Sequence, residues 1–352
     1  MGGIWFWLLV ATLAAYVVLD GFGLGEGILH LWIARDAAGR RAAARSLGRA
    51  WYRNEVWLLA IGFTLAIAFP AVYEAVLGGF RAPLAIVLAL LIVRVVSERL
   101  PDFEAGVRWS AACDICLAIA STLLVAMYGV LLGNVIRGVP IDARGRFLEP
   151  LWANFRPAGR TGMLDSYTIL VGVTAVAALA LHGATRLAGR AGGELTGRAV
   201  KYASSIWWAV ALLTAVITVT SFRVLPRFVL SYRVRPWGFV FPVFAVAGLL
   251  GVKWFLHEWQ LRPAFLASCV YLTAMIASVG SGLYPTVFPS SMNPVFGGLM
   301  ASGATMTGSA VISKFVLWFV GIALAAGYTF LAHRRPTSAT ISTAEAEAPE
   351  RA

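Results

Sequence analysis

Ionisable side chains stand inside or at the ends of several long apolar stretches of this sequence, where they could exchange protons or hold a charged group. A charge within a lipid-embedded segment is costly, so each such residue is a functional candidate. Long side chains near a helix end, such as those of Glu98 and Lys314, can reach the polar interface, whereas an aspartate is too short. The residues with this placement are Asp20, Glu26, Glu55, Arg94, Glu98, Asp114, His182 and Lys314.

Most of these residues mark the ends of the first four apolar stretches and fall toward one face of the membrane. Carboxylates gathered around one arginine at a single depth could carry protons or hold a cofactor propionate. They could equally form a structural ion-pair network, and the sequence favours neither reading. In chain order the polar residues at these ends are Asp20 and Glu26, Asn54 and Glu55, Arg94 and Glu98, and Asp114.

The histidines and cysteines of the sequence are the candidate ligands of a haem or a metal ion. A b-type haem held between two helices needs an axial pair of His or Met side chains. No two histidines are paired at a suitable helical spacing, so this chain alone is not expected to supply the axial ligands of a haem. Cys113 and Cys116 lie in an apolar helical run without a second pair of ligands, which favours buried structural cysteines over a zinc site. The four histidines are His30, His182, His257 and His333.

The composition identifies the solvent around these groups. The 352-residue chain is 59% hydrophobic and 13% charged, and its mean hydropathy is +0.78. Soluble domains carry about a quarter charged residues, so this chain is predicted to lie in lipid. The net charge of +12 comes from basic residues in short stretches between apolar segments. That placement is typical of loops facing anionic lipid and argues against nucleic acid.

The fold is predicted to be all-α and polytopic. A bilayer core needs about 20 apolar helical residues, and about nine stretches meet this requirement. We expect two four-helix bundles, formed by the first four and the next four helices, plus one peripheral helix. Residues 1–335 would be membrane-embedded, and 336–352 a disordered cytoplasmic tail. The stretches lie roughly at 3–22, 55–75, 82–98, 111–134, 166–186, 204–222, 237–256, 264–284 and 310–332.

The orientation follows from the first loop. Residues 35–53 contain six arginines, and short loops rich in basic residues stay on the cytoplasmic side of a membrane. The N-terminus is therefore predicted to lie outside and the C-terminus inside. All of the polar residues in the first four stretches then lie toward the cytoplasmic half.

Several motifs resemble one known family. Asp20–Gly27 (DGFGLGEG) is similar to Asp-Gly-Phe-Asp-x-Gly-x-Gly, and Trp51–Leu58 (WYRNEVWL) to Trp-Asp-Gly-Asn-(Glu/Gln)-Val-Trp-Leu. Gly133–Pro140 (GNVIRGVP) follows Gly-Asn-x-x-x-Gly-Val-Pro, and Leu283–Pro285 looks like Leu-Phe-Pro. By their order and spacing, from about residue 4 to 335, the chain is identified as a divergent member of subunit II of the cytochrome bd-type quinol oxidases.

The resemblance implies a heterodimer in a bacterial inner membrane with a homologous subunit I. That partner would hold the axial ligands of two b-type haems and one d-type haem, as well as the quinol site. The complex would oxidise quinol and reduce oxygen to water. Subunit II would not be catalytic alone; it would support the partner and contribute to proton and oxygen access. A small accessory subunit and a structural quinone or lipid are further components that the resemblance allows.

The candidate residues for a proton path, or for a position near a cofactor, follow from the matched motifs and the buried charges. Two family acids are replaced, by Gly23 and by Tyr52, and Arg53 replaces the glycine after the second. Glycine cannot relay a proton, and tyrosine, with a reference pKa near 10, does not act as a carboxylate does. We hypothesise that Glu26, on nearly the same helix face as Gly23, substitutes. The candidates are Asp20, Glu26, Asn54, Glu55, Trp57, Arg94, Glu98, Asp114 and Asn134.

Two other function classes were weighed. A proton-coupled secondary transporter would often show internal repeats and helices broken at mid-span, but no repeat is visible, and Asp20 and Glu55 stand at helix ends. A purely structural subunit of a membrane electron-transfer complex is the second alternative. It differs from the oxidase reading in one respect, namely whether turnover requires the polar cluster.

Overall fold

The computed structural model describes residues 2–33, 54–100, 107–142, 147, 150–151, 162–292, 297–301 and 309–334. Apart from the short antiparallel pair β1 (Thr286–Pro289) and β2 (Gly298–Met300), the regular elements within these ranges are helices. The predicted basic loop 35–53 and tail 336–352 lie outside the described residues. The helices are α1 (Gly2–Leu19), α2 (Gly21–Ile33), α4 (Val56–Ala68), α5 (Pro70–Gly79), α6 (Arg81–Arg99), α7 (Val107–Arg137), α8 (Ser166–Arg190), α9 (Gly193–Val224), α10 (Pro226–Val234), the 3-10 helix η3 (Pro236–Phe239), α11 (Val240–His257), α12 (Leu261–Leu283) and α13 (Ser309–Arg334).

The predicted all-α membrane fold is confirmed, but the count of nine spans is not. Seven helical runs in the described residues are long and apolar enough to cross a bilayer. The pair α5 and α6, bent by 82°, raises this number to eight, and α4 is a shorter apolar helix of 13 residues. The stretch predicted at 55–75 breaks at Phe69 because Pro70 begins a new helix, and proline cannot continue the hydrogen-bond ladder.

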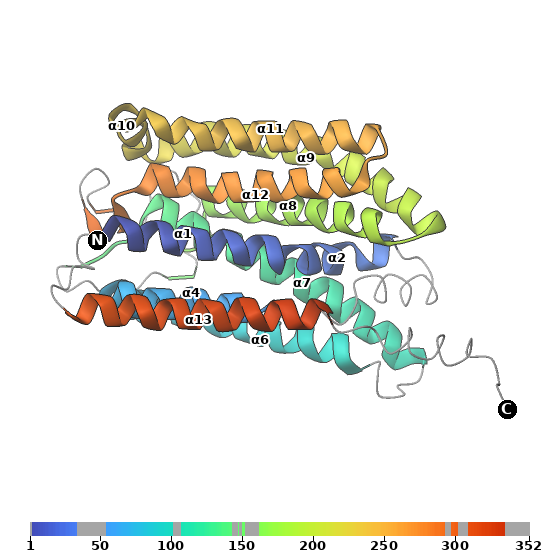
Figure 1. Cartoon of the computed structure of the whole chain (residues 1–352), viewed down its shortest axis with the longest axis horizontal. Coiled ribbons are helices and arrows are strands. Elements are labelled where there is room, and N and C mark those ends of the chain that lie inside the picture. The colour runs from blue at the N-terminus through green and yellow to red at the C-terminus, as the bar shows by residue number, and fades with distance from the viewer. Residues whose placement is uncertain are drawn as a thin grey trace.

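The helices pack as two groups with α1 and α2 along the seam between them (Figure 1). In the first group α4 packs on α1, and α6 packs on α7. In the second group α8 contacts α9 and α12, and α11 packs on α12. Helix α2 contacts both α7 and α8, and α13 lies against α4 at the edge of the first group. This arrangement matches the predicted two bundles and peripheral helix.

A close crossing of α2 and α8 fixes the position of the seam. A Cβ added at Gly25 would overlap the carbonyl oxygen of Leu179, and a Cβ at Gly183 would collide with the backbone of α2. The two helices therefore touch backbone to backbone, as small residues permit in membrane bundles. Helix α2 contributes its glycines to this contact, so Asp20 and Glu26 stand at the centre of the molecule rather than on its lipid-facing surface.

Candidate functional site

The strongest candidate site is a buried ionic group centred on Arg94 of α6. The Arg94 side chain is 1% exposed, and it faces three carboxylates. Its Nη1 lies 3.5 Å from Oδ2 of Asp20 and 3.6 Å from Oε1 of Glu55, and its Nε lies 3.1 Å from Oε1 of Glu98. We call these four residues the Arg94 group. Of the acids that the sequence places at one depth, Asp20, Glu55 and Glu98 meet at Arg94.

Three different elements place the carboxylates of the Arg94 group. Glu98 follows Arg94 by one turn of α6, so helical periodicity alone brings the two together. Asp20 joins α1 to α2; its backbone N–H donates to the carbonyl of Tyr16, and its own carbonyl accepts from Leu24. The helical path therefore continues through Asp20, and the short side chain stays buried at this junction.

Asn54 holds the third carboxylate in place. Its side-chain amide donates to the backbone carbonyl of Leu19, and its backbone carbonyl accepts a hydrogen bond from the backbone N–H of Trp57 at 3.0 Å. Asn54 therefore ties the start of α4 to the end of α1, so that Glu55 reaches Arg94. Glu55 is the most open member of the group, with 33% of its side chain exposed. Proton exchange with water outside the group is easiest there.

Two buried acceptor atoms in and beside the Arg94 group lack hydrogen-bond partners, although burial makes an unpaired acceptor costly. Burying charges costs several kcal/mol per ion unless the geometry and hydrogen bonds compensate. Oδ1 of Asp20 and Oδ1 of Asn54 have no hydrogen-bond partner among the described residues, and both side chains are fully buried. Buried acceptors nearly always find a protein group or an ordered water. The arrangement can therefore bind water or a proton as well as hold an ion pair.

A tyrosine pair that the sequence analysis missed extends the Arg94 group. The Tyr16 hydroxyl donates to the Tyr128 hydroxyl at 2.9 Å, joining α1 to α7. Tyr16 stands one turn before Asp20, and its hydroxyl feels the charges of both Asp20 and Arg94. The only sequence signal for this pair was the four-residue spacing from Tyr16 to Asp20, which places both on one helix face.

Glu26 lies apart from the Arg94 group. The charged groups acting on the Glu26 carboxylate are Arg186 and Arg190 of α8, whereas those acting on Arg94 are Asp20, Glu98, Glu55 and Tyr16. The Glu26 side chain is 6% exposed, and neither carboxylate oxygen has a hydrogen-bond partner in the described part of the chain.

Asp114 also lies outside the Arg94 group. Its Oδ1 lies 2.8 Å from Nε2 of His30, which joins the end of α2 to the start of α7. The pair spans 84 residues of sequence, so helix packing alone brings it together. From the sequence, His30 is distinguished only as one of four histidines without an axial partner.

Other candidates serve the frame of the bundle. Trp57 donates from Nε1 to the Thr329 hydroxyl at 3.1 Å and so fastens α4 to α13. Lys314, near the start of α13, donates to the carbonyl of Ile67 at 2.8 Å, close to the end of α4. Tyr52 and Arg53, where the family motif is altered, lie outside the described residues.

Asn134 stands at the opposite end of the molecule from the Arg94 group. Its amide donates to the carbonyls of Val130 and Met163 at 2.8 and 2.9 Å, and its Oδ1 accepts from Arg137 at 2.8 Å. Arg137 also pairs with Asp165, whose carboxylate caps α8 through the backbone N–H of Thr168 at 2.8 Å. This network holds the α7–α8 connection and is separate from the buried acids.

Two histidines, His182 and His30, are each hydrogen-bonded within the chain. Both ring nitrogens of His182 are engaged, Nδ1 with the Ser268 hydroxyl at 2.7 Å and Nε2 with the carbonyl of Val18 at 3.1 Å. The ring is fully buried and stacks on Phe265. His30 is held by Asp114. Within the described ranges, no cluster of three or more His, Cys, Asp or Glu side chains could hold a metal ion.

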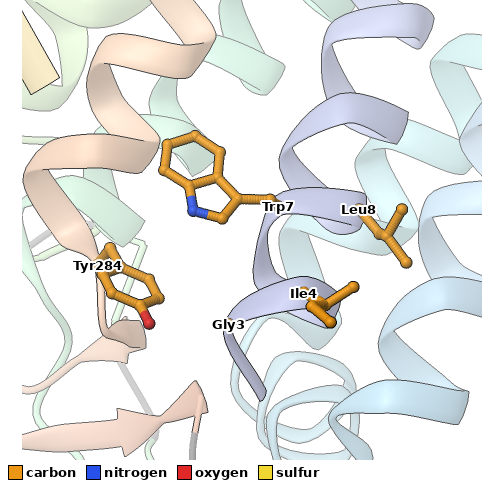
Figure 2. A pocket seen from close by; sticks show the side chains of 5 residues that line it. All are labelled: Gly3, Ile4, Trp7, Leu8 and Tyr284. Atoms are coloured by element: carbon orange, nitrogen blue, oxygen red, sulfur yellow. The ribbon is translucent and has the colours of Figure 1, made fainter. Parts of the chain in front are cut away.

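An open pocket of about 580 Å³ lies near the start of α1 (Figure 2). Gly3, Ile4, Trp7 and Leu8 line it from α1, and Tyr284 lines it from the end of α12. The Trp7 and Tyr284 rings face each other with centroids 6.5 Å apart. Aromatic residues gather at this depth in membrane proteins, near the headgroups. No acid or base lines the pocket, so it is not the candidate site.

Comparison with known proteins identifies the family. Residues 1–335 match the family described as cytochrome bd terminal oxidase subunit II. The cytochrome bd-I ubiquinol oxidase subunit 2 of Escherichia coli (strain K12) is 34% identical over 193 residues, which are 54% of this chain and 49% of that protein. The probable cytochrome oxidase subunit 2 of Haemophilus influenzae is 27% identical over 92% of this chain and 91% of that protein. The matched region of this chain thus spans about half the length of the Escherichia coli relative.

The fold agrees with the family. The structure of bd oxidase from Geobacillus thermodenitrificans superposes with a TM-score of 0.71 at 17% identity, covering 95% of this chain and 97% of that one. At this identity the likeness supports the fold alone. None of these matches supports the transporter alternative. Because the family match extends over residues 1–335 of the 352, the chain belongs to the cytochrome bd terminal oxidase subunit II family.

Proposed function

We propose that this chain is subunit II of a bacterial quinol:oxygen oxidoreductase and works beside a haem-bearing subunit I. The observation that carries the proposal is the family match over residues 1–335. The names of the Escherichia coli and Bacillus subtilis relatives describe ubiquinol oxidase subunits, which supports a quinol as the reductant. His30 and His182 are each hydrogen-bonded within the chain, which supports placing the haems, two b-type and one d-type, in the partner.

Within the complex, the part assigned to this chain is proton delivery. Reduction of oxygen to water consumes one proton for each electron, and a buried reaction centre needs a hydrogen-bonded route from the aqueous phase. The Arg94 group offers carboxylates that can exchange protons while Arg94 keeps part of their charge compensated. Asp20 and Glu98 are the buried members, and Glu55 is the member nearest to the surface.

The orientation in the membrane sets where these protons come from. The six arginines of residues 35–53 favour a cytoplasmic position for the loop after α2. The N-terminus then lies outside, and the described end of α13 lies on the cytoplasmic side. Because Asp20 lies past the middle of the span Gly2–Ile33 and Glu98 stands in the last turn of α6, the Arg94 group lies toward the cytoplasmic half. The protons used for water formation would therefore come from the cytoplasm.

The test is co-purification of this chain with the product of the neighbouring gene, followed by an optical spectrum and a quinol-driven oxygen-uptake assay. The proposal predicts a red absorption band of a chlorin-type haem in the reduced complex, and oxygen uptake that depends on quinol. A stable chain that carries no haem and gathers no partner would overturn it. An active complex whose turnover is unaffected by Asp20→Asn or Glu98→Gln would leave the chain a structural subunit.

A further inference from the structure

A group of cations lies at the end of α8, apart from the Arg94 group. The Arg186 guanidinium lies over two aromatic rings, 5.0 Å from the Phe22 centroid on α2 and 4.8 Å from the Phe265 centroid on α12. Contacts with ring faces hold a guanidinium in place and leave the N–H groups at its edge available for an acceptor. Arg190 stands one turn further along α8, so a second cation lies beside the first.

The N–H groups of Arg186 lack an acceptor. Its Nε is buried and has no hydrogen-bond partner among the described residues. The carboxylate that acts on Arg186 is that of Glu26, but neither Glu26 oxygen accepts a hydrogen bond within the described ranges. A guanidinium offers five donors, and buried polar atoms nearly always find a partner. Arg186 therefore has donors for a group that the described part of the chain does not supply.

A third cation comes from the start of α12. A Cβ added at Gly189 would meet Leu261 at ordinary contact distance, so α12 begins against the last turn of α8. Arg262 follows Leu261 and stands three residues before Phe265, which places these two side chains on one face of α12. Both Arg190 and Arg262 are exposed. We define the Arg186 cluster as Arg186, Arg190 and Arg262 with the rings of Phe22 and Phe265.

The Arg186 cluster lies at the depth of lipid headgroups. Arg186 is four residues from the end of α8, which is about 6 Å along the helix axis. Helices α2 and α8 run in the same direction, because Gly21 contacts Leu179 and Gly25 contacts Gly183. Their ends therefore lie at the same end of the molecule (Figure 1). In the proposed orientation this end is cytoplasmic, since the basic residues 35–53 follow α2.

Cations outnumber carboxylates at this end of the second helix group. Glu194 pairs with Arg198 at 3.5 Å, and Glu258 is exposed beyond the end of α11. The cytoplasmic leaflet carries anionic lipids, and basic sites between helices on this side bind their phosphate groups. The basic side chains at this end are Arg186, Arg190, Arg198, Lys201, Lys253 and Arg262.

An exposed apolar surface continues from the Arg186 cluster along α12. Leu266 and Val270 are 61% and 43% exposed, and they follow Phe265 toward the middle of the helix. Their four-residue spacing places both on one face. A phosphate at the arginines and acyl chains along these two side chains would fit this order of charged and apolar groups. A soluble anion would use only the charged part, so the continuity favours a lipid.

We propose that the Arg186 cluster binds the phosphodiester group of an anionic phospholipid from the cytoplasmic leaflet. Arg186 and Arg190 donate N–H groups to the phosphate oxygens, and Arg262 adds positive charge from α12. The Glu26 carboxylate opposes the phosphate, but three arginines against one carboxylate leave the cluster positive. The acyl chains lie along the exposed face of α12. Lipid binding at this place does not depend on the proposed oxidase function.

The test compares two spin-labelled lipids, phosphatidylglycerol and phosphatidylcholine, on the purified complex with its partner subunit in phosphatidylcholine vesicles. The variants are Arg186→Gln, Arg186→Lys and Arg190→Gln. Lys201→Gln is the matched control, because Lys201 is an exposed cation at the same end of the molecule, on α9. Salt at about 1 M shortens the Debye length to about 3 Å and so suppresses general attraction to exposed charges. A parallel series adds inorganic phosphate.

The unaltered complex should prefer phosphatidylglycerol. Arg186→Gln should lower this preference about tenfold, the size expected for losing a hydrogen bond between charged groups. Arg186→Lys and Arg190→Gln should lower it less, and Lys201→Gln should match the unaltered complex. Because Arg190 is exposed, its variant decides the question even if Arg186→Gln does not assemble.

Three results would overturn the lipid site. The first is an unaltered complex that binds both lipids equally. The second is a preference that both glutamine variants retain in full, or that Lys201→Gln loses to the same extent. The third is a preference that inorganic phosphate abolishes, because the cluster would then hold a free anion rather than a lipid.

Discussion

Replacing Arg94 with glutamine should strongly destabilise this chain. Arg94 is the common member of three ion pairs, at 3.1, 3.5 and 3.6 Å, and both Asp20 and Glu98 are buried with it. Removing one partner of a buried pair typically costs about 3–5 kcal/mol, because the remaining charge has lost its compensation. Here two buried carboxylates would be left, so we expect a loss of unfolding free energy in the upper part of that range.

A double variant separates the cost of the uncompensated carboxylates from the cost of losing the packing of the Arg94 side chain. In the double variant Arg94→Gln with Glu98→Gln, one stranded charge is removed along with the arginine. Residues in one ion-pair network are not additive, so the double variant should be more stable than Arg94→Gln alone by about 1.5–3 kcal/mol, the order of a hydrogen bond to a charged group. The stability of Arg94→Lys should lie between that of the unaltered chain and that of Arg94→Gln, because an ammonium keeps the charge but lacks the fork geometry that reaches several carboxylates.

Thermal unfolding of the detergent-solubilised complex, followed by tryptophan fluorescence, would measure these differences. Glu258→Gln, at an exposed site, provides the baseline for removing a carboxylate without burial. If Arg94→Gln unfolds at the temperature of the unaltered chain, the group contributes no net stability, and the reasoning from three shared ion pairs is wrong. If the double variant is less stable than the single one, the stranded-charge explanation fails.

Three further predictions follow from the described contacts. Asn54→Ala should free the start of α4 from Leu19 and lower turnover more than stability, which oxygen uptake and thermal unfolding measure together. Gly25→Ala should prevent assembly, because its Cβ would overlap the Leu179 carbonyl; size-exclusion chromatography would detect a normal complex if this is incorrect. His182→Gln should leave the haem spectrum unchanged because both ring nitrogens are already bonded within the chain, and a lost haem band would contradict that assignment.

Much of the Arg94 group could be predicted because its members obey rules of local geometry. Arg94 and Glu98 are four residues apart, so any helix places them on one face. Asp20 and Glu55 end and begin apolar stretches on the same side of the membrane, and depth alone brings them near Arg94. Ion pairing and proton exchange are not distinguished by the sequence, because both use the same residues.

Other contacts depend on the register between packed helices, which local sequence patterns do not encode. His30 and Asp114 are 84 residues apart, and Tyr16 and Tyr128 are 112 residues apart. Their pairing requires the register of α7 against α1–α2, and that register depends on close contacts such as the one at Gly27. Periodicity placed Glu26 near the face of Gly23, but the packing of α8 separates it electrostatically from the Arg94 group.

The count of nine spans is not confirmed, for a reason that the sequence does contain. Pro70 follows Phe69 within the stretch predicted at 55–75, and a proline inside an apolar run often ends a helix. The structure begins α5 at Pro70 and bends again between α5 and α6. Hydropathy averages over such breaks, so composition predicted a single span where the backbone makes two helices.

The measurement that tests the central claim most directly is proton uptake by the complex carrying Asp20→Asn, after a single turnover with its haem spectrum intact. If this chain delivers protons through the Arg94 group, uptake should slow about a hundredfold, the lower end of the effect expected for a lost proton carrier, while electron transfer from quinol still begins. Uptake at the rate of the unaltered complex would show that protons reach the partner subunit by a route that does not pass through Asp20.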